Sequence, residues 1–136
     1  MKIAAVSQDG MTISQHFGRA PFYIVVTVEN GKIVSREQRD KMGHAQFAAE
    51  RHDHHDHGEK DPRGHGFGAA AQARHARMAA AIADCDVLLV RGMGAGAYQS
   101  MQQAGIRPIV TDIPKIDDAV QAVLDGTIKD LTERLH

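Results

Sequence analysis

A glycine-rich turn between a predicted strand and a predicted helix constrains this chain more than any other feature. The turn, RGMGAGA, spans residues 91–97 and follows an apolar run at 86–90. That run has the composition of a strand buried on both faces. Residues 98–104 are predicted to form a short helix ending at Gly105. Because glycine lets the backbone approach a ligand and helix N-termini attract anions, the turn predicts a site for a negatively charged ligand.

The length and composition indicate one globular domain without a nucleic-acid or membrane partner. The chain has 136 residues, with 16 basic against 17 acidic side chains. The near-zero net charge gives no overall attraction to nucleic acid or membranes, and no apolar run is long enough to span a bilayer. Cys85 is the single cysteine, which excludes an internal disulfide and a thiolate-held iron–sulfur cluster within one chain. With no signal peptide at the start, we expect a cytoplasmic protein.

The order of elements predicts an α/β domain with a mixed sheet. Strands are expected at 2–7, 22–28, 32–37, 86–90 and 108–111, and helices at 69–83, 98–104 and about 116–124. Asn30-Gly31 is a strong hairpin signal between the second and third strands. Gly126 stands where a helix C-terminal glycine belongs. A hairpin followed by alternating helices and strands favours a sheet that is antiparallel at one edge and parallel elsewhere.

This arrangement brings two distant segments to one crevice. If strands 2–7 and 86–90 are parallel neighbours, their carboxyl ends open at the same edge, where α/β sheets bind ligands. His16 and Arg19 would then lie opposite Arg91 and Met93. An imidazole can contact a soft metal, and the guanidinium groups can neutralise an anion.

A histidine-rich tract interrupts the pattern. From about residue 40 to 68 the apolar periodicity disappears, and we expect a disordered insertion because too little apolar surface is available to order it. Four of its histidines, flanked by two others, are candidate ligands for zinc, nickel or copper: His52, His54, His55 and His57. We expect this binding to be adventitious.

Several motifs, taken in order, resemble the dinitrogenase iron–molybdenum cofactor-binding family. They are KIAAV at 2–6, Gly10, HFGRAPF at 16–22, DCDV at 84–87, GMGAGA at 92–97, AGI at 104–106, TD at 111–112 and DDAV at 117–120. The resemblance covers nearly the whole chain apart from about thirty central residues. The chain departs from it at Arg91, where many members have another glycine, and this adds a fixed positive charge beside the turn.

The resemblance implies a fold, a cargo and a set of partners. The fold is a ribonuclease H-like motif, a five-stranded mixed sheet flanked by helices. The cargo is a preformed anionic cluster of molybdenum and sulfur with iron or copper, held by a carrier that does not transform it. The implied partners are cofactor-assembly proteins or ATPases of the orange-protein type, and the oligomeric state stays open. The residues expected at the cluster are His16, Arg19, Arg91, Gly92, Met93, Gly94, Ala95 and Gly96.

Two other functions compete with a carrier. The first is a divalent-metal buffer, in which the histidine tract binds the metal and the folded domain is only a scaffold. The second is a nucleotide-binding regulatory domain, disfavoured because only 24 residues follow Asp112, the candidate ribose ligand. We do not expect an enzyme, since the first strand lacks the carboxylates that a ribonuclease H-type nuclease requires.

Overall fold

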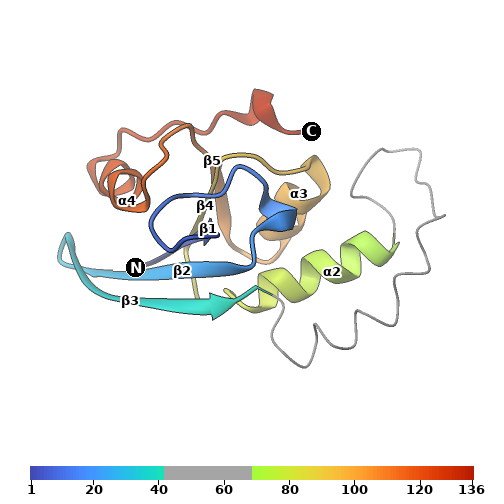
Figure 1. Cartoon of the computed structure of the whole chain (residues 1–136), viewed down its shortest axis with the longest axis horizontal. Helices are drawn as coiled ribbons and strands as arrows, with labels where there is room; N and C mark the ends of the chain where they lie inside the picture. The colour runs from blue at the N-terminus through green and yellow to red at the C-terminus, as the bar shows by residue number, and fades with distance from the viewer. Residues whose placement is uncertain (42–68) are drawn as a thin grey trace.

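The computed structural model describes residues 1–41 and 69–136, which form a five-stranded sheet with helices on both sides (Figure 1). The sheet has the order β3-β2-β1-β4-β5. Its elements, in chain order, are β1 (Lys2–Ser7), the 3-10 turn η1 (Phe17–Arg19), β2 (Phe22–Glu29), β3 (Lys32–Asp40), α2 (Ala69–Ala80), β4 (Val87–Val90), α3 (Ala95–Gln103), β5 (Arg107–Val110), α4 (Ile116–Asp125) and the 3-10 turn η2 (Thr132–Arg134). No helix in the described ranges is long and apolar enough to cross a membrane.

The strand directions confirm the predicted mixed sheet. β2 runs antiparallel to both β1 and β3, whereas β1, β4 and β5 are parallel. Ile3 pairs with Val87, so β1 and β4 are direct neighbours although more than 80 residues separate them in sequence. The carboxyl ends of both strands therefore reach the same edge of the sheet.

The turn chemistry is confirmed, while several element boundaries differ from the prediction. Asn30 and Gly31 have φ values of 54° and 76°, as a tight hairpin turn requires, and Gly126 ends α4 with φ of 72°. The helix predicted from residue 98 begins at Ala95, because the small residues of the turn form its first buried face. β3 continues to Asp40, three residues beyond the predicted end of that strand at residue 37, and residues 42–68 of the predicted insertion lie outside the described residues.

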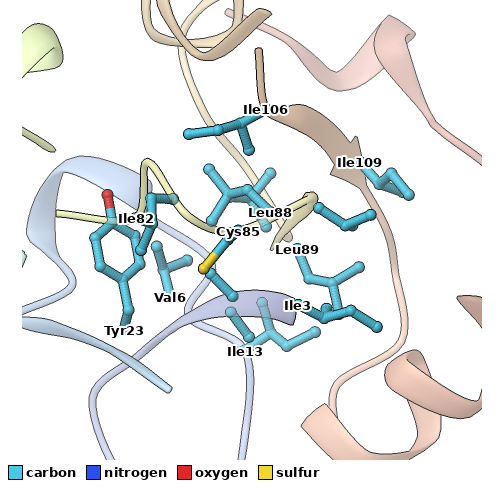
Figure 2. Packing of buried hydrophobic residues seen from close by; sticks show 14 of the residues in the cluster. Ile3, Val6, Ile13, Tyr23, Ile82, Cys85, Leu88, Leu89, Ile106 and Ile109 are labelled. Carbon is cyan, nitrogen blue, oxygen red and sulfur yellow. The ribbon is translucent and has the colours of Figure 1, made fainter. Parts of the chain in front are cut away.

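The core is aliphatic and lies on both faces of the sheet. Helices α2 and α3 cover one face and α4 the other (Figure 1). Figure 2 shows the Cys85 sulfur inside this core, among aliphatic side chains. Only 4% of Cys85 is exposed, and burial raises the pKa of its thiol to about 11. Tyr23 is fully buried, and its hydroxyl donates a hydrogen bond to the Met78 carbonyl at 3.0 Å.

Lys41 is a buried cation beside the turn η1. Only 3% of the residue is exposed, and its Nζ lies 4.3 Å from the centroid of the Phe17 ring and donates to the Phe17 carbonyl. Burial disfavours the ammonium form and lowers the pKa of Lys41 to about 8. Lys41 thus fixes the end of β3 against the loop that carries His16.

The lowered pKa of Lys41 predicts that stability rises with pH between about 8 and 9. In this range the unfolded chain binds more protons than the folded chain, because an unfolded lysine keeps its ordinary pKa. We expect the wild type to gain about 1 kcal/mol over the variant Lys41→Met from pH 8 to pH 9, measured by urea unfolding. The raised pKa of Cys85 acts in the opposite direction on the total stability, but it cancels in this comparison because both proteins contain Cys85. The exposed Lys32→Met is the control, and a pH-independent difference for Lys41→Met would contradict the prediction.

Candidate functional site

The loop that carries His16 begins with a tight turn held by Asp9. The Asp9 carboxylate accepts hydrogen bonds from the N–H groups of Met11 and Thr12 at 2.9 and 2.8 Å, and from the Thr12 hydroxyl at 2.8 Å. These bonds stabilise the ionised form and lower the pKa of Asp9 to about 2. The buried Ser7 hydroxyl donates to the Thr12 carbonyl at 2.7 Å and closes the turn from the strand side.

Backbone hydrogen bonds fix the rest of the loop on both sides. The Ile13 N–H donates to the Pro114 carbonyl at 2.8 Å, and the Ser14 N–H donates to the Val6 carbonyl at 2.8 Å. The Ser14 hydroxyl then interacts with the main chain of His16, accepting from its N–H at 3.2 Å. His16 therefore stands exposed on a loop whose backbone is held rigidly.

Gly92 is the point at which this loop meets the glycine-rich turn. Its carbonyl accepts a hydrogen bond from the Phe17 N–H at 3.0 Å. A Cβ atom at Gly92 would lie 2.5 Å from the Gln15 carbonyl oxygen, which is closer than real Cβ contacts come. Residue 92 must therefore be glycine for the two segments to touch, and the predicted meeting of the His16 loop with the turn is confirmed.

An open hollow of about 380 Å³ lies where these segments meet. Its lining consists of two arginines, two histidines, a glutamine and a glycine, namely Arg91, Arg134, His16, His136, Gln15 and Gly92. Among the described residues, no aspartate or glutamate side chain lines it. The buried Nε of Arg91 has no hydrogen-bond partner within the described parts of the chain. An unsatisfied buried donor costs free energy, and the two arginines of the lining make the hollow suited to an anion.

The structure brings only some of the predicted site residues together. His16, Arg91 and Gly92 share the hollow. Arg19 is exposed at the end of η1, and Met93 is 1% exposed and packs in the core. Gly94 precedes α3, Ala95 and Gly96 form its first turn, and the Ala95 N–H donates to the main-chain oxygen of His136 at 2.9 Å. The tract histidines His52, His54, His55 and His57 lie outside the described residues.

Sequence reasoning did not find Gln15, Arg134 or His136. Gln15 lies beside His16, and its role as a contact of Gly92 depends on backbone proximity rather than on residue type. Arg134 and His136 come from a segment without regular periodicity, so no pattern placed them near residue 91. Two basic residues separated by Leu135 were the available signal.

The described residues contain no group of three or more histidine, cysteine, aspartate or glutamate side chains that could hold a metal ion. The site just described therefore lacks the ligand set of a bare divalent cation such as zinc, which needs three or four donors of this kind.

Comparison with known proteins decides the family. A family model described as dinitrogenase iron-molybdenum cofactor matches residues 1–126. This chain belongs to that family. An uncharacterized protein of Methanocaldococcus jannaschii is 25% identical over 129 residues, which cover 95% of this chain and 90% of the relative. The dinitrogenase iron-molybdenum cofactor family match ends ten residues before the sequence does, so Arg134 and His136 lie beyond it.

Solved structures share the fold of this member of the dinitrogenase iron-molybdenum cofactor family. The apo form of the orange protein from Desulfovibrio gigas aligns with a TM-score of 0.63 and 23% identity, covering 95% of this chain and 91% of that chain. A Methanocaldococcus jannaschii protein provisionally titled a dinitrogenase aligns with a TM-score of 0.61 and 9% identity, covering 97% and 95%. At these identities the likeness establishes the α/β fold. The family match itself points to a cofactor-binding or accessory role.

Proposed function

We propose that this protein is a carrier that binds a preassembled, anionic metal–sulfur cluster, containing molybdenum with iron or copper, and releases it unchanged. One observation carries the proposal: the hollow collects two guanidinium groups and two imidazoles, and no aspartate or glutamate side chain among the described residues lines it. Such a lining repels a free cation and attracts a polyanion. Arg91 lines this space, and its buried Nε has no hydrogen-bond partner among the described residues.

The same lining favours binding of a metal–sulfur cluster over binding of a bare metal ion. Two imidazoles alone do not complete the coordination of zinc or copper, whereas a cluster arrives with its metals already bound by sulfide. The protein then needs only to balance charge and to offer a weak metal contact. We assign the charge balance to Arg91 and the metal contact to His16, with Arg19 and the turn residues Gly92–Gly96 as the surrounding frame.

Weak attachment suits a carrier because the cargo has to leave. Cys85 is buried in the core and its raised pKa keeps it a neutral thiol, so it does not hold the cluster covalently. The open hollow leaves one side of the cluster accessible to a recipient. We propose cofactor-assembly proteins, or ATPases of the orange-protein type, as the exchange partners.

The test is retention of the cluster after desalting. The full-length protein is incubated with tetrathiomolybdate and copper, or with extracted iron–molybdenum cofactor, and passed through a gel-filtration column. We expect the charge-transfer absorbance to elute with the protein and molybdenum to be retained in a fixed ratio. Retention of plain zinc or nickel without any retention of the cluster would overturn the proposal in favour of a metal buffer.

The variant Arg91→Gln is expected to weaken cluster retention by roughly 10- to 150-fold, since a charged hydrogen bond to a partly desolvated anion contributes about 1.5–3 kcal/mol. The side chain lies at a strand end, and we expect the melting temperature to change little. Equilibrium dialysis at two salt concentrations measures the effect. Arg107→Gln is the matched control, because this exposed arginine begins β5 at the opposite edge of the sheet. Equal retention by Arg91→Gln and the wild type would show that this guanidinium does not contact the cluster.

A further inference from the structure

Residues 127–136 cross from α4 to the glycine-rich turn along a fixed path. Asp130 anchors the path through both carboxylate oxygens: Oδ1 accepts from the Val110 N–H at 2.9 Å and Oδ2 from the Tyr98 hydroxyl at 2.5 Å. The Leu131 N–H then donates to the Val110 carbonyl at 2.8 Å. These three bonds attach the segment to the ends of β5 and α3.

Beyond this anchor the segment reaches the turn itself. The main-chain oxygen of His136 accepts from the Ala95 N–H at 2.9 Å, and the His136 N–H donates to the Met93 carbonyl at 3.3 Å. Figure 1 shows the red end of the chain close to the start of α3. The backbone pairing places Arg134 and His136 at the hollow, where both line its wall.

We propose that residues 131–136 form the second half of the cluster site, with Arg134 and His136 gripping the cargo opposite Arg91 and His16. This inference rests on the proposed function and extends it to residues outside the family match. Each half of the site then supplies one guanidinium and one imidazole.

Two features of the hollow support the proposal that the ligand is bound between Arg91 and Arg134. Like charges that face the same space repel each other, and no aspartate or glutamate side chain among the described lining residues offsets the two guanidinium groups. A multivalent anion placed between them removes that repulsion and makes charge-assisted hydrogen bonds to each. The Ala95 N–H, which would otherwise be an anion donor at the helix start, is already bonded to His136. The segment thus occupies one of the backbone donors that the sequence predicted for the anion, and it adds the charge of its own side chains.

The test compares cluster retention by Arg134→Gln, His136→Gln and the double variant with that of the wild type. The probe is the product of tetrathiomolybdate and copper(I), measured by dialysis with absorbance and metal analysis. We expect each single variant to retain the cluster about tenfold less well and the double variant less still. Thermal melting is expected to stay unchanged, since both side chains are exposed. Lys129→Gln is the matched control, as it removes the same charge from an exposed position of the same segment.

A second variant tests the path rather than the side chains. Asp130→Ala removes the two hydrogen bonds from Val110 and Tyr98 but keeps Arg134 and His136 in the sequence. Because the segment then loses its fixed path, we expect this variant also to lower cluster retention. Wild-type retention by the double variant, with loss in His16→Ala, would overturn this inference and leave the carrier function standing. No retention by the wild type itself would overturn the proposed function. An equal loss in Lys129→Gln would show a general charge effect and would also overturn the inference.

Discussion

Replacing Gly92 with alanine is expected to lower stability and to abolish cluster uptake together. The new Cβ would lie 2.5 Å from the Gln15 carbonyl oxygen, and that oxygen belongs to backbone that cannot rotate away. Relieving the overlap requires the loop and the turn to separate, which breaks the Phe17–Gly92 hydrogen bond. Forced overpacking of this kind costs about 1–3 kcal/mol in folding free energy. Urea unfolding and cluster retention on the same preparation measure both effects.

The loop offers a matched control for Gly92→Ala. A Cβ added at Gly18, two residues after His16, meets nothing within 4 Å. Gly18→Ala is therefore expected to keep both the stability and the cluster uptake of the wild type. If Gly92→Ala behaves as Gly18→Ala does, the loop and the turn are not in contact and the geometry of the site is wrong.

His16→Ala is expected to reduce uptake of the molybdenum–sulfur cluster sharply without affecting the fold. The side chain is exposed and the loop is held by backbone bonds of Ile13 and Ser14, so circular dichroism and melting should match the wild type. Among the described residues that the loop and the turn contribute to the hollow, His16 is the one histidine. Its loss leaves charge attraction without a metal contact, and retention after desalting measures the difference.

A variant of the histidine tract is expected to show the reverse of the His16→Ala phenotype. Changing His52, His54, His55 and His57 to asparagine is expected to remove zinc and nickel binding and to leave cluster uptake intact. His16→Ala is expected to show the reverse pattern. Cluster uptake that is normal in His16→Ala and lost in the tract variant would place the cargo on the tract, and the buffer function would replace the carrier.

Local chemistry predicted the frame of this fold well. Asn30-Gly31 predicted the hairpin because both residues adopt positive φ readily, and the apolar run before Arg91 predicted a buried strand beside β1. The family resemblance is likewise confirmed. The start of α3 was wrong by three residues because glycine has a low helix propensity, which tertiary packing of Gly96 and Ala97 overrides.

The wall formed by Arg134 and His136 was beyond sequence reasoning for a different reason. Its position depends on the hydrogen bonds that Val110 and Tyr98 donate to Asp130. It depends further on the two backbone hydrogen bonds between residue 136 and the turn. None of these bonds follows from periodicity or residue type, since each joins an irregular segment to a distant element. By contrast, the meeting of His16 with Gly92 followed from strand order alone.

The pairing of β1 with β4 also sets when, during synthesis, the protein becomes able to load its cargo. His16 is made early, but the strand that places Gly92 beside its loop follows more than 70 residues later. Contacts so distant in sequence form late, after the cost of closing a long loop has been met. A growing chain that has not reached β4 has only Gln15 and His16 of the residues that line the hollow. Under the proposed carrier function, such a chain is expected to hold no cluster, and loading is expected only after the centre of the sheet has formed.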